Sequence, residues 1–397
     1  MLPSLLADLW VLLKDWRKVG KPSAATRPFN SLLNTFFFLF NLFSMSRSSF
    51  FSFSLLAVLM LVGAGCFGRG EIDASTDGGV WKSLDAGETW VQSVAVPTPA
   101  GVNSASGTNV LTLAHDPSDH LALYAGLERD GLLFSYDGAA GWQRSGDAAV
   151  SSGAVTAVAV DPAEKCRVYV ARAERIFRSE DCNRSYEDEI YIETKPGVIV
   201  TAITIDWFTP SQVYAAFSDG TILKSSDRGA KWTSVFRGRQ AVTSLLVSRA
   251  DSRVLLAGMA GAGMARSVDG GETWEVVLDP LRPYRDANRV IALAQDGQGS
   301  VIYVATYYGL LRSVDQGVSW EPLNLLSAPN QVMIGDLATD PANPNVILYS
   351  VGGSLYKSVD AGANWSVQKL PTLRFISAIL FDRTNSNVVY VGLRKIE

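Results

Sequence analysis

The eight residues SLDAGETW, Ser83 to Trp90, form a motif that recurs along the chain with the pattern S-x-D-x-G-x-x-W. Copies of this motif begin at Ser83, Ser135, Ser179, Ser225, Ser267, Ser313 and Ser358. Successive copies begin 52, 44, 46, 42, 46 and 45 residues apart. A spacing of this size is typical of a repeat protein, in which one small unit is repeated because it cannot bury its own apolar face.

Each repeat also contains two short β-branched segments at constant positions. The first ends in a turn residue, as in VTAVAVDP at 155 and VTAITIDW at 200, and the second follows after a few polar residues, as in CRVYVA at 166. A third strand ends at the motif serine and a fourth opens at the motif tryptophan. Four antiparallel strands in about 45 residues are typical of one blade of a β-propeller.

The two ends of the repeat region complement each other. The region opens with GGVWKSLDAGETWVQS, which supplies a third and a fourth strand, and it ends with NVVYVGLRKIE, which supplies a second strand. Joined, they make one blade. We therefore predict an all-β fold over residues 79–397, a single seven-bladed propeller of four-stranded antiparallel blades. Pairing of the N- and C-terminal half-blades closes the ring, so that no long sheet edge is left unpaired.

The residue types of the motif follow from the chemistry of a tight turn. The aspartate side chain is suited to accept hydrogen bonds from nearby backbone amides, and the glycine supplies a positive φ. Ala139 and Asn183 replace this glycine in two copies. The motif aspartates are Asp85, Asp137, Asp181, Asp227, Asp269, Asp315 and Asp360. The motif tryptophans, expected to bury an apolar face against the blade, are Trp90, Trp142, Trp232, Trp274, Trp320 and Trp365, and Tyr186 takes this position in the third copy.

These motifs resemble the Asp-box, or BNR, repeats of a propeller group. The group includes sialidases, xyloglucan-type glycoside hydrolases, the luminal domain of sortilin-like receptors and the photosystem II stability and assembly factors. The resemblance covers about 320 residues and implies the propeller fold. It says little about function, because the group contains both enzymes and binding proteins. A single ring, an export segment and the lack of a catalytic set make the chain most similar to the assembly factors, which implies an assembly or scaffolding role.

Two cysteines of the repeat region are expected to form a disulfide. The segment CRVYVARAERIFRSEDC is a predicted hairpin whose midpoint lies near Glu174, so Cys166 and Cys182 stand opposite each other on neighbouring strands. A cysteine pair in an exported protein favours a disulfide bridge.

The N-terminal part of the chain carries an apolar segment typical of an export signal. Residues 50–65 form an uncharged run, FFSFSLLAVLMLVGAG, which follows Arg47 and ends in small residues before Cys66. The sequence GAGC resembles the lipobox of bacterial lipoproteins, which implies lipidation of Cys66, although Gly63 stands where that motif usually has leucine. The alternative is a single transmembrane anchor built from the same segment.

These features divide the chain into four parts. Residues 1–44 are an N-terminal extension of uncertain role, since translation can also begin at Met45. Residues 45–66 are the signal or anchor, 67–78 a linker and 79–397 the propeller. We expect an exported protein of the cell envelope, on its periplasmic or outer surface, held by a lipid or membrane anchor at its N-terminus.

The charge of the chain and its histidines exclude several classes of function. Residues 66–397 carry 29 Lys and Arg against 37 Asp and Glu, which argues against nucleic acid as a partner. His115 and His120, the two histidines, lie beside one turn and form neither a nucleophilic triad nor a metal set. We therefore expect no metal and no cofactor.

One carboxylate outside the motifs is a weak catalytic candidate. Asp77 lies in STDGGVWKS, a stretch that resembles the N-terminal segment of xyloglucan-type hydrolases, where a catalytic aspartate lies. Those enzymes place the second carboxylate on a second propeller, and a glycosidase needs both. The alternative function is therefore a glycoside hydrolase or a carbohydrate-binding propeller.

The leading hypothesis is a non-catalytic, membrane-tethered propeller that binds a protein partner or an envelope polymer through its loops. The motif turns and the Asp-Pro turns lie on one face of the predicted ring, and longer, variable loops lie on the other. The partner-binding candidates on that other face are Arg282, Tyr284, Arg285, Tyr307 and Tyr308. Exposed Tyr and Arg are the residue types that dominate protein–protein interfaces.

Overall fold

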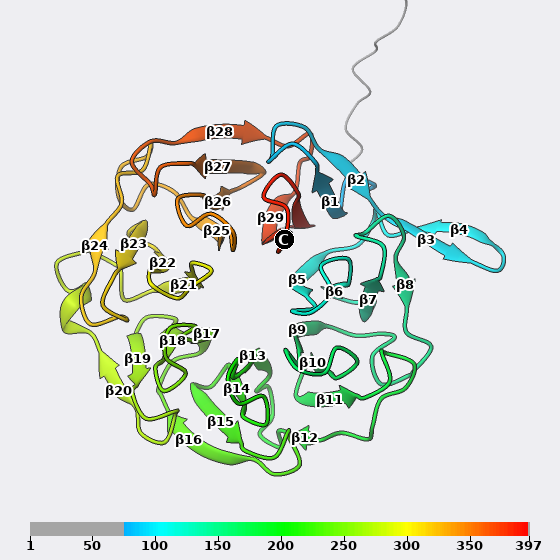
Figure 1. The fold of residues 1–397 in the computed structure, drawn as a ribbon, viewed down its shortest axis with the longest axis horizontal. Helices are drawn as coiled ribbons and strands as arrows, with labels where there is room; N and C mark the ends of the chain where they lie inside the picture. Colours follow the sequence, from blue (N-terminus) through cyan, green and yellow to red (C-terminus); the bar gives the residue numbers. More distant parts are fainter. Residues whose placement is uncertain (1–74, 396–397) are drawn as a thin grey trace, which may run out of the picture. The chain divides into compact units, whose positions relative to one another are not determined.

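The computed structural model describes residues 75–395, which form seven four-stranded antiparallel sheets and one two-stranded hairpin. The sheets stand around an axis as the blades of a ring (Figure 1). Blade 1 consists of β5 (Val110–His115), β6 (Leu123–Leu127), β7 (Leu132–Ser135) and β8 (Gln143–Arg144). Blade 2 consists of β9 (Val155–Val160), β10 (Val168–Arg172), β11 (Arg175–Ser179) and β12 (Tyr191–Ile192). Blade 3 consists of β13 (Val200–Ile205), β14 (Val213–Phe217), β15 (Thr221–Ser225) and β16 (Thr233–Arg237).

The remaining blades follow the same plan. Blade 4 consists of β17 (Val242–Val247), β18 (Leu255–Met259), β19 (Gly263–Ser267) and β20 (Glu275–Val277). Blade 5 consists of β21 (Val290–Gln295), β22 (Ile302–Thr306), β23 (Leu310–Ser313) and β24 (Glu321–Pro322). Blade 6 consists of β25 (Ile334–Thr339), β26 (Ile347–Val351), β27 (Ser354–Ser358) and β28 (Ser366–Lys369). The closing blade contains β29 (Phe375–Phe381), β30 (Val389–Arg394), β1 (Gly79–Ser83) and β2 (Val91–Ser93). A single 3₁₀ turn, η1 (Asp279–Leu281), is the one helical element of the described part.

The ring is closed by its two ends, as predicted from the complementary half-blades. Strand β1 pairs antiparallel with β30 over five residues, from Gly79 opposite Leu393 to Ser83 opposite Val389. Figure 1 shows β1 and β2 beside β29 at the point where the ring meets itself. The predicted seven-bladed, end-paired architecture is confirmed.

A hairpin that the repeat did not predict extends outward from the ring. Strands β3 (Ala95–Thr98) and β4 (Gly101–Ser104) pair only with each other and project beyond the blades (Figure 1). They lie between the first two motif copies, which are the farthest apart at 52 residues. The hairpin therefore accounts for the extra length of that repeat.

The apolar core lies between neighbouring blades. One cluster joins Tyr124 and Phe134 of blade 1 to Phe177 of blade 2, and the next joins Tyr169 of blade 2 to Phe217 of blade 3. Each blade thus buries its face against the following blade, as a repeated unit without a core of its own requires.

The motif turns all have the same hydrogen bonds. In the first copy, Ser83 Oγ donates to Asp85 Oδ1 (2.8 Å), Gly87 N donates to Ser83 Oγ (2.8 Å) and Thr89 N donates to Asp85 Oδ1 (2.8 Å). The equivalent bonds from the amide to the aspartate occur in the other six copies. The motif aspartates thus satisfy the amides of the turn.

Two successive residues of each motif turn have a positive φ. In the first copy these are Ala86 (58°) and Gly87 (94°). The two replacements keep this conformation, with φ of 64° at Ala139 and 67° at Asn183. The left-handed region costs a residue with a Cβ about 1–2 kcal/mol, and the shared hydrogen bonds offset this cost.

The motif tryptophans are buried to different degrees. Trp142 and Trp320 are buried, whereas Trp90, Trp232, Trp274 and Trp365 are only half-buried. The expectation that each buries its apolar face against the blade therefore holds fully for two copies and partly for four. All of these rings open an outer strand, and the two buried ones have additional contacts: Trp142 Nε1 donates to Ser93 O (2.9 Å), and Tyr284 Oη donates to Trp320 O (3.0 Å).

A disulfide joins Cys166 to Cys182, as the hairpin pattern predicted. The backbone amide of Cys182 also donates to the carbonyl of Cys166 (3.2 Å). In other blades an equivalent bond connects the motif turn to the turn between the first and second strands, as from Arg228 N to Ser211 O. The two turns of a blade therefore lie on one face of the ring, and in blade 2 they are also joined covalently.

The predicted N-terminal extension, the signal or anchor segment with Cys66, and most of the predicted linker lie outside the described residues. Within residues 75–395, no helix is long and apolar enough to cross a membrane.

Candidate functional site

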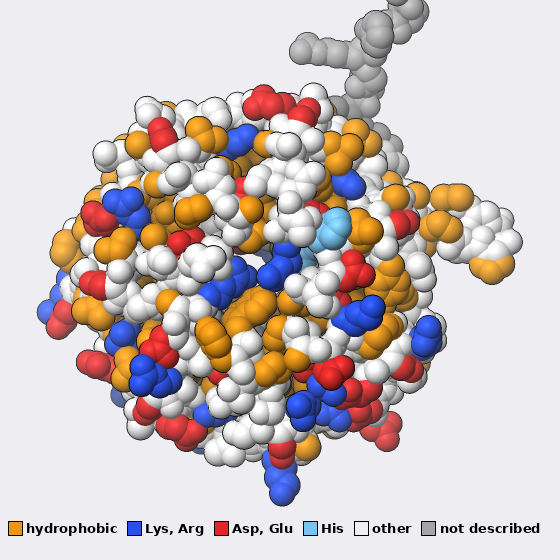
Figure 2. Space-filling model, in the orientation of Figure 1, with side chains coloured by type: hydrophobic (Ala, Val, Ile, Leu, Met, Phe, Trp, Pro, Cys, Tyr) orange, Lys and Arg blue, Asp and Glu red, His pale blue; other side chains and the backbone are white. Residues whose placement is uncertain are grey.

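A cavity of about 360 Å³ lies on the axis of the ring. Its wall consists of the last residues of the seven innermost strands and of the turns that follow them. Because those turns are bonded to the motif turns, the cavity opens on the motif-turn face. Figure 2 shows that face, with basic side chains gathered around the central opening.

Three cavity residues occupy one equivalent position in three different blades. Where three other repeats have the proline of an Asp-Pro turn and one has Gly297, VTAITIDW has Trp207, VTSLLVSR has Arg249 and ISAILFDR has Arg383. The sequence contained this departure, but only ring closure shows that the three positions converge on the axis.

The two guanidinium groups lie against one indole ring. Their central carbons are 4.6 Å (Arg249) and 5.2 Å (Arg383) from the centre of the Trp207 ring, within the range of a cation–π contact. The Gln295 side chain holds the backbone that carries Arg249. Its Oε1 accepts a hydrogen bond from Arg249 N (2.9 Å), and its Nε2 donates to Val247 O (2.9 Å).

Neither guanidinium is neutralised by the protein. Among residues 75–395 neither Arg249 nor Arg383 forms an ion pair, and the buried Nε of Arg249 has no hydrogen-bond partner. Burial, and then the positive charge of Arg383, lower the pKa of Arg249 to about 10. Burial also lowers the pKa of Arg383. Both side chains remain cationic at neutral pH, and the cavity has a positive mouth.

The two histidines lie at the edge of this cavity. His115 Nε2 contacts the carbonyl oxygen of Phe381, and His120 Nδ1 lies 3.1 Å from Asp382 Oδ2. Burial lowers the pKa of His115 to about 4, so its ring is neutral at pH 7. No group of three His, Cys, Asp or Glu side chains suited to a metal ion occurs in the described ranges.

Asp77, the weak catalytic candidate, lies in a buried ion pair. Its Oδ1 accepts from Arg374 Nε (2.9 Å), and its Oδ2 accepts from Thr372 Oγ1 (2.9 Å) and Leu373 N (2.7 Å). Both side chains are at most 5% exposed. Burial opposes ionisation, but these hydrogen bonds and the charge of Arg374 outweigh it and lower the pKa of Asp77. Asp77 therefore connects the start of the ring to the loop before β29.

The five partner-binding candidates come together in one loop cluster on the opposite face. The rings of Tyr284 and Tyr308 lie 5.2 Å apart and pack partly against the core. Arg282 and Arg285 are exposed, and Tyr307 is half-buried. The tyrosines thus offer less free surface than their loop positions suggested.

Sequence reasoning missed a set of basic residues that connect the blades. The residue before the motif serine is Lys or Arg in six copies, and five of these side chains donate to the motif turn of the next blade: Lys82 to Gly138 O, Arg178 to Arg228 O, Lys224 to Gly270 O, Arg266 to Gln316 O and Lys357 to Ala86 O.

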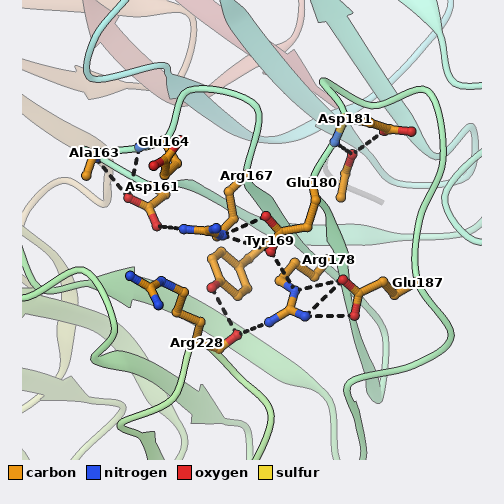
Figure 3. A network of polar contacts seen from close by, with 11 residues as sticks. Asp161, Ala163, Glu164, Arg167, Tyr169, Arg178, Glu180, Asp181, Glu187 and Arg228 are labelled. Atoms are coloured by element: carbon orange, nitrogen blue, oxygen red, sulfur yellow. Dashed lines mark hydrogen bonds and ion pairs between the residues drawn. The ribbon is translucent and has the colours of Figure 1, made fainter.

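Tyrosines of the second strands reinforce these links. Figure 3 shows Tyr169 and Arg178 of blade 2 donating to the same carbonyl, Arg228 O. Arg178 is held in place by Glu187, and Arg167 pairs with Asp161 and Glu180 beside it (Figure 3). We call these contacts, from a Lys or Arg of one blade to the motif turn of the next blade, the inter-blade latch. The repeated Lys or Arg before the motif serine was the sequence feature that marked it.

Comparisons with known proteins identify relatives of the fold. No family model matches the chain. A xyloglucanase from Paenibacillus is 31% identical over 163 residues, which cover 30% of this chain and 16% of the relative. The structure of a xyloglucanase from Xanthomonas campestris matches with a TM-score of 0.57 at 18% identity, over 72% of this chain and 51% of that one.

A smaller propeller matches over almost its whole length. The structure described as YCF48 bound to D1 peptide has a TM-score of 0.57 at 16% identity, and the match covers 76% of this chain and 95% of that one. The present chain spans only about half of the xyloglucanase structure. The chain is thus a seven-bladed β-propeller with seven turns of the Asp-box type, similar in fold to the xyloglucanase and YCF48 structures.

Proposed function

We propose that this propeller is a non-catalytic binding protein that takes a segment of a partner protein at the mouth of its axial cavity. The observation that carries the proposal is the unneutralised pair Arg249 and Arg383, held on Trp207 above a cavity of about 360 Å³. Arg and Trp are enriched among residues that dominate protein interfaces. Both arginines are half-buried, and a ligand that covers them and supplies a carboxylate would give each charge the partner it lacks.

The size of the ring supports a binding role. The YCF48 structure, 95% of which is covered by the match to this chain, is described as bound to D1 peptide. By analogy, we propose a scaffolding or assembly role for this chain, with a protein as its partner.

The experiment is affinity capture from detergent-solubilised envelope of the native host, followed by mass spectrometry. The baits are the full chain, an Arg249→Gln/Arg383→Gln variant and an Arg282→Gln/Arg285→Gln variant as the matched control on the opposite face. We expect the native bait and the control to retain one stoichiometric protein that the cavity variant loses. Loss in the control alone would transfer the binding role to the opposite face. Absence of any protein from all three baits would contradict the proposal.

The sequence similarity to xyloglucanases favours a second candidate, a glycan-binding or glycoside-hydrolysing propeller. This candidate has to assign a catalytic role to Asp77, whose two oxygens are both engaged by neighbouring groups. Incubation with a β-glucan panel and binding to a glycan array test it. Release of reducing sugar that Asp77→Asn abolishes would establish it in place of the first.

We also propose that the protein is exported and anchored through its N-terminal segment. The Cys166–Cys182 disulfide supports an oxidising compartment. Metabolic labelling with a palmitate analogue tests the lipid anchor. Labelling that Cys66→Ala removes would support it, and export without labelling would favour the transmembrane alternative.

A further inference from the structure

We infer that the axial cavity is a carboxylate site, which takes an acidic group attached to an apolar chain, with the carboxylate at the mouth and the chain below it. This inference rests on the proposed function and specifies its ligand. Its basis is the convergence of one Trp and two Arg side chains from three blades above an apolar wall.

The mouth of the cavity selects charge. Arg249 and Arg383 present guanidinium groups that no carboxylate of residues 75–395 reaches as an ion pair, and the buried Nε of Arg249 has no hydrogen-bond partner. A guanidinium binds a carboxylate through short, charge-assisted hydrogen bonds, often two in parallel. Stacking on Trp207 limits the motion of both groups, so little entropy is lost when the ligand binds.

The acidic residues nearest the mouth are already engaged in their own turns. Asp296 Oδ1 accepts from Ser300 N (2.7 Å), and Asp116 Oδ1 accepts from Ser118 N (2.7 Å) and Ser118 Oγ (2.8 Å). Both carboxylates are at most 3% exposed. Asp382 Oδ1 likewise accepts from Thr384 N (2.8 Å), and its Oδ2 lies 3.1 Å from His120 Nδ1. The arginines are therefore the groups that a ligand meets.

The wall below the mouth selects apolar atoms. It is lined by innermost-strand residues such as Leu245, Leu293 and Leu380, each half-buried and facing a space that no protein atom fills. An inorganic anion would leave this surface wet, whereas a carboxylate with an aliphatic chain would cover it. The two halves of the cavity thus fit one amphipathic acid.

Isothermal titration of the full chain in a mild nonionic detergent tests this inference. The probes are hexanoate, hexan-1-ol as its neutral counterpart, and sodium sulfate as an anion without an apolar chain. We expect hexanoate to bind and the other two to bind at least about tenfold more weakly, the difference that one charged hydrogen bond makes. Equal binding of hexan-1-ol, or of sulfate, would overturn the inference.

Variants locate the binding. Arg249→Gln and Arg383→Gln should each weaken hexanoate binding about tenfold or more, and Arg249→Lys, which keeps the charge but loses the fork, should weaken it less. Arg282→Gln/Arg285→Gln is the matched control and should bind hexanoate as the native chain does. Because the cavity arginines repel each other, the glutamine variants should melt no lower than the native protein. Unchanged affinity in folded cavity variants would overturn the inference.

A third set of probes identifies the source of the carboxylate. These are a peptide that ends in a free-acid leucine, its C-terminal amide, and an amide with one internal glutamate. Binding of the first alone assigns a chain terminus, and binding of the third assigns an acidic side chain. Failure of all three beside tight hexanoate binding would keep the carboxylate site and contradict the protein partner. A captured partner that the cavity variants still bind would contradict partner binding at the cavity, and the hexanoate titration would then decide the carboxylate site by itself.

Discussion

The buried Asp77–Arg374 pair offers a direct test of whether Asp77 is structural. Replacing Asp77 with Asn leaves Arg374 charged and at most 2% exposed, without its counter-ion. Breaking a buried pair from one side costs about 3–5 kcal/mol. Unfolding of a ring of about 320 residues has an entropy near 0.7 kcal/mol/K, so this loss lowers Tm by about 4–7 °C.

Thermal unfolding followed by circular dichroism measures this shift. Arg282→Gln is the matched control, because Arg282 pairs with Asp279 on the surface, with both side chains more than 70% exposed. An exposed pair contributes less than about 1 kcal/mol, so the control should melt within about 2 °C of the native protein. Because folding lowers the pKa of Asp77, the contribution is present at neutral pH and is lost as the pH falls through that lowered pKa. An Asp77→Asn variant that melts like the native protein would refute the structural role.

Three further predictions concern the inter-blade latch, the disulfide and the titration of Asp336. Lys224→Met removes the donor to Gly270 O and should lower the free energy of unfolding by about 1–3 kcal/mol in urea titrations, whereas Lys369→Met, an exposed lysine of β28, should not. Reduction of Cys166–Cys182, which closes a loop of 16 residues, should cost about 3 kcal/mol, and a reduced protein of unchanged stability would contradict this. Asp336 lies in β25, and its Oδ2 accepts a hydrogen bond from Ile379 N (2.7 Å). Burial raises the pKa of Asp336 to about 7, so its contribution to stability should fall as the pH rises from 4 to 7. Asp336→Asn should flatten the pH dependence of stability over this range, and an unchanged slope would contradict the prediction.

The sequence predicted those parts of the fold that depend on local chemistry. The motif turns follow from the residues of each turn alone, and Ala139 and Asn183 keep its geometry because the serine and aspartate bonds persist. Closure followed from the complementary ends. The β3–β4 hairpin was not predicted, since it lies outside the repeat and only an unusually long spacing marked it.

The candidate site was harder to predict, because it depends on contacts between distant repeats. The partner-binding residues were sought in the long loops of the opposite face, where Tyr284 and Tyr308 prove to pack partly into the core. Trp207, Arg249 and Arg383 are separated by 42 and 134 residues in sequence, and only a closed ring brings them to one axis. Aligning the repeats and comparing the position that follows each first-strand Asp, or Ser248 in the fourth blade, would have singled them out.

The central claim is that a partner binds at the cavity mouth, and site-specific photo-crosslinking in the native host tests it most directly. A benzoylphenylalanine replaces Phe208, which is 63% exposed and follows Trp207, or Leu326, which is 61% exposed in the loop between β24 and β25 on the opposite face. We expect one defined protein adduct from position 208, lost when Arg249 and Arg383 are changed to glutamine, and none from position 326. An adduct from position 326 alone, or one at 208 that survives the arginine changes, would contradict the claim.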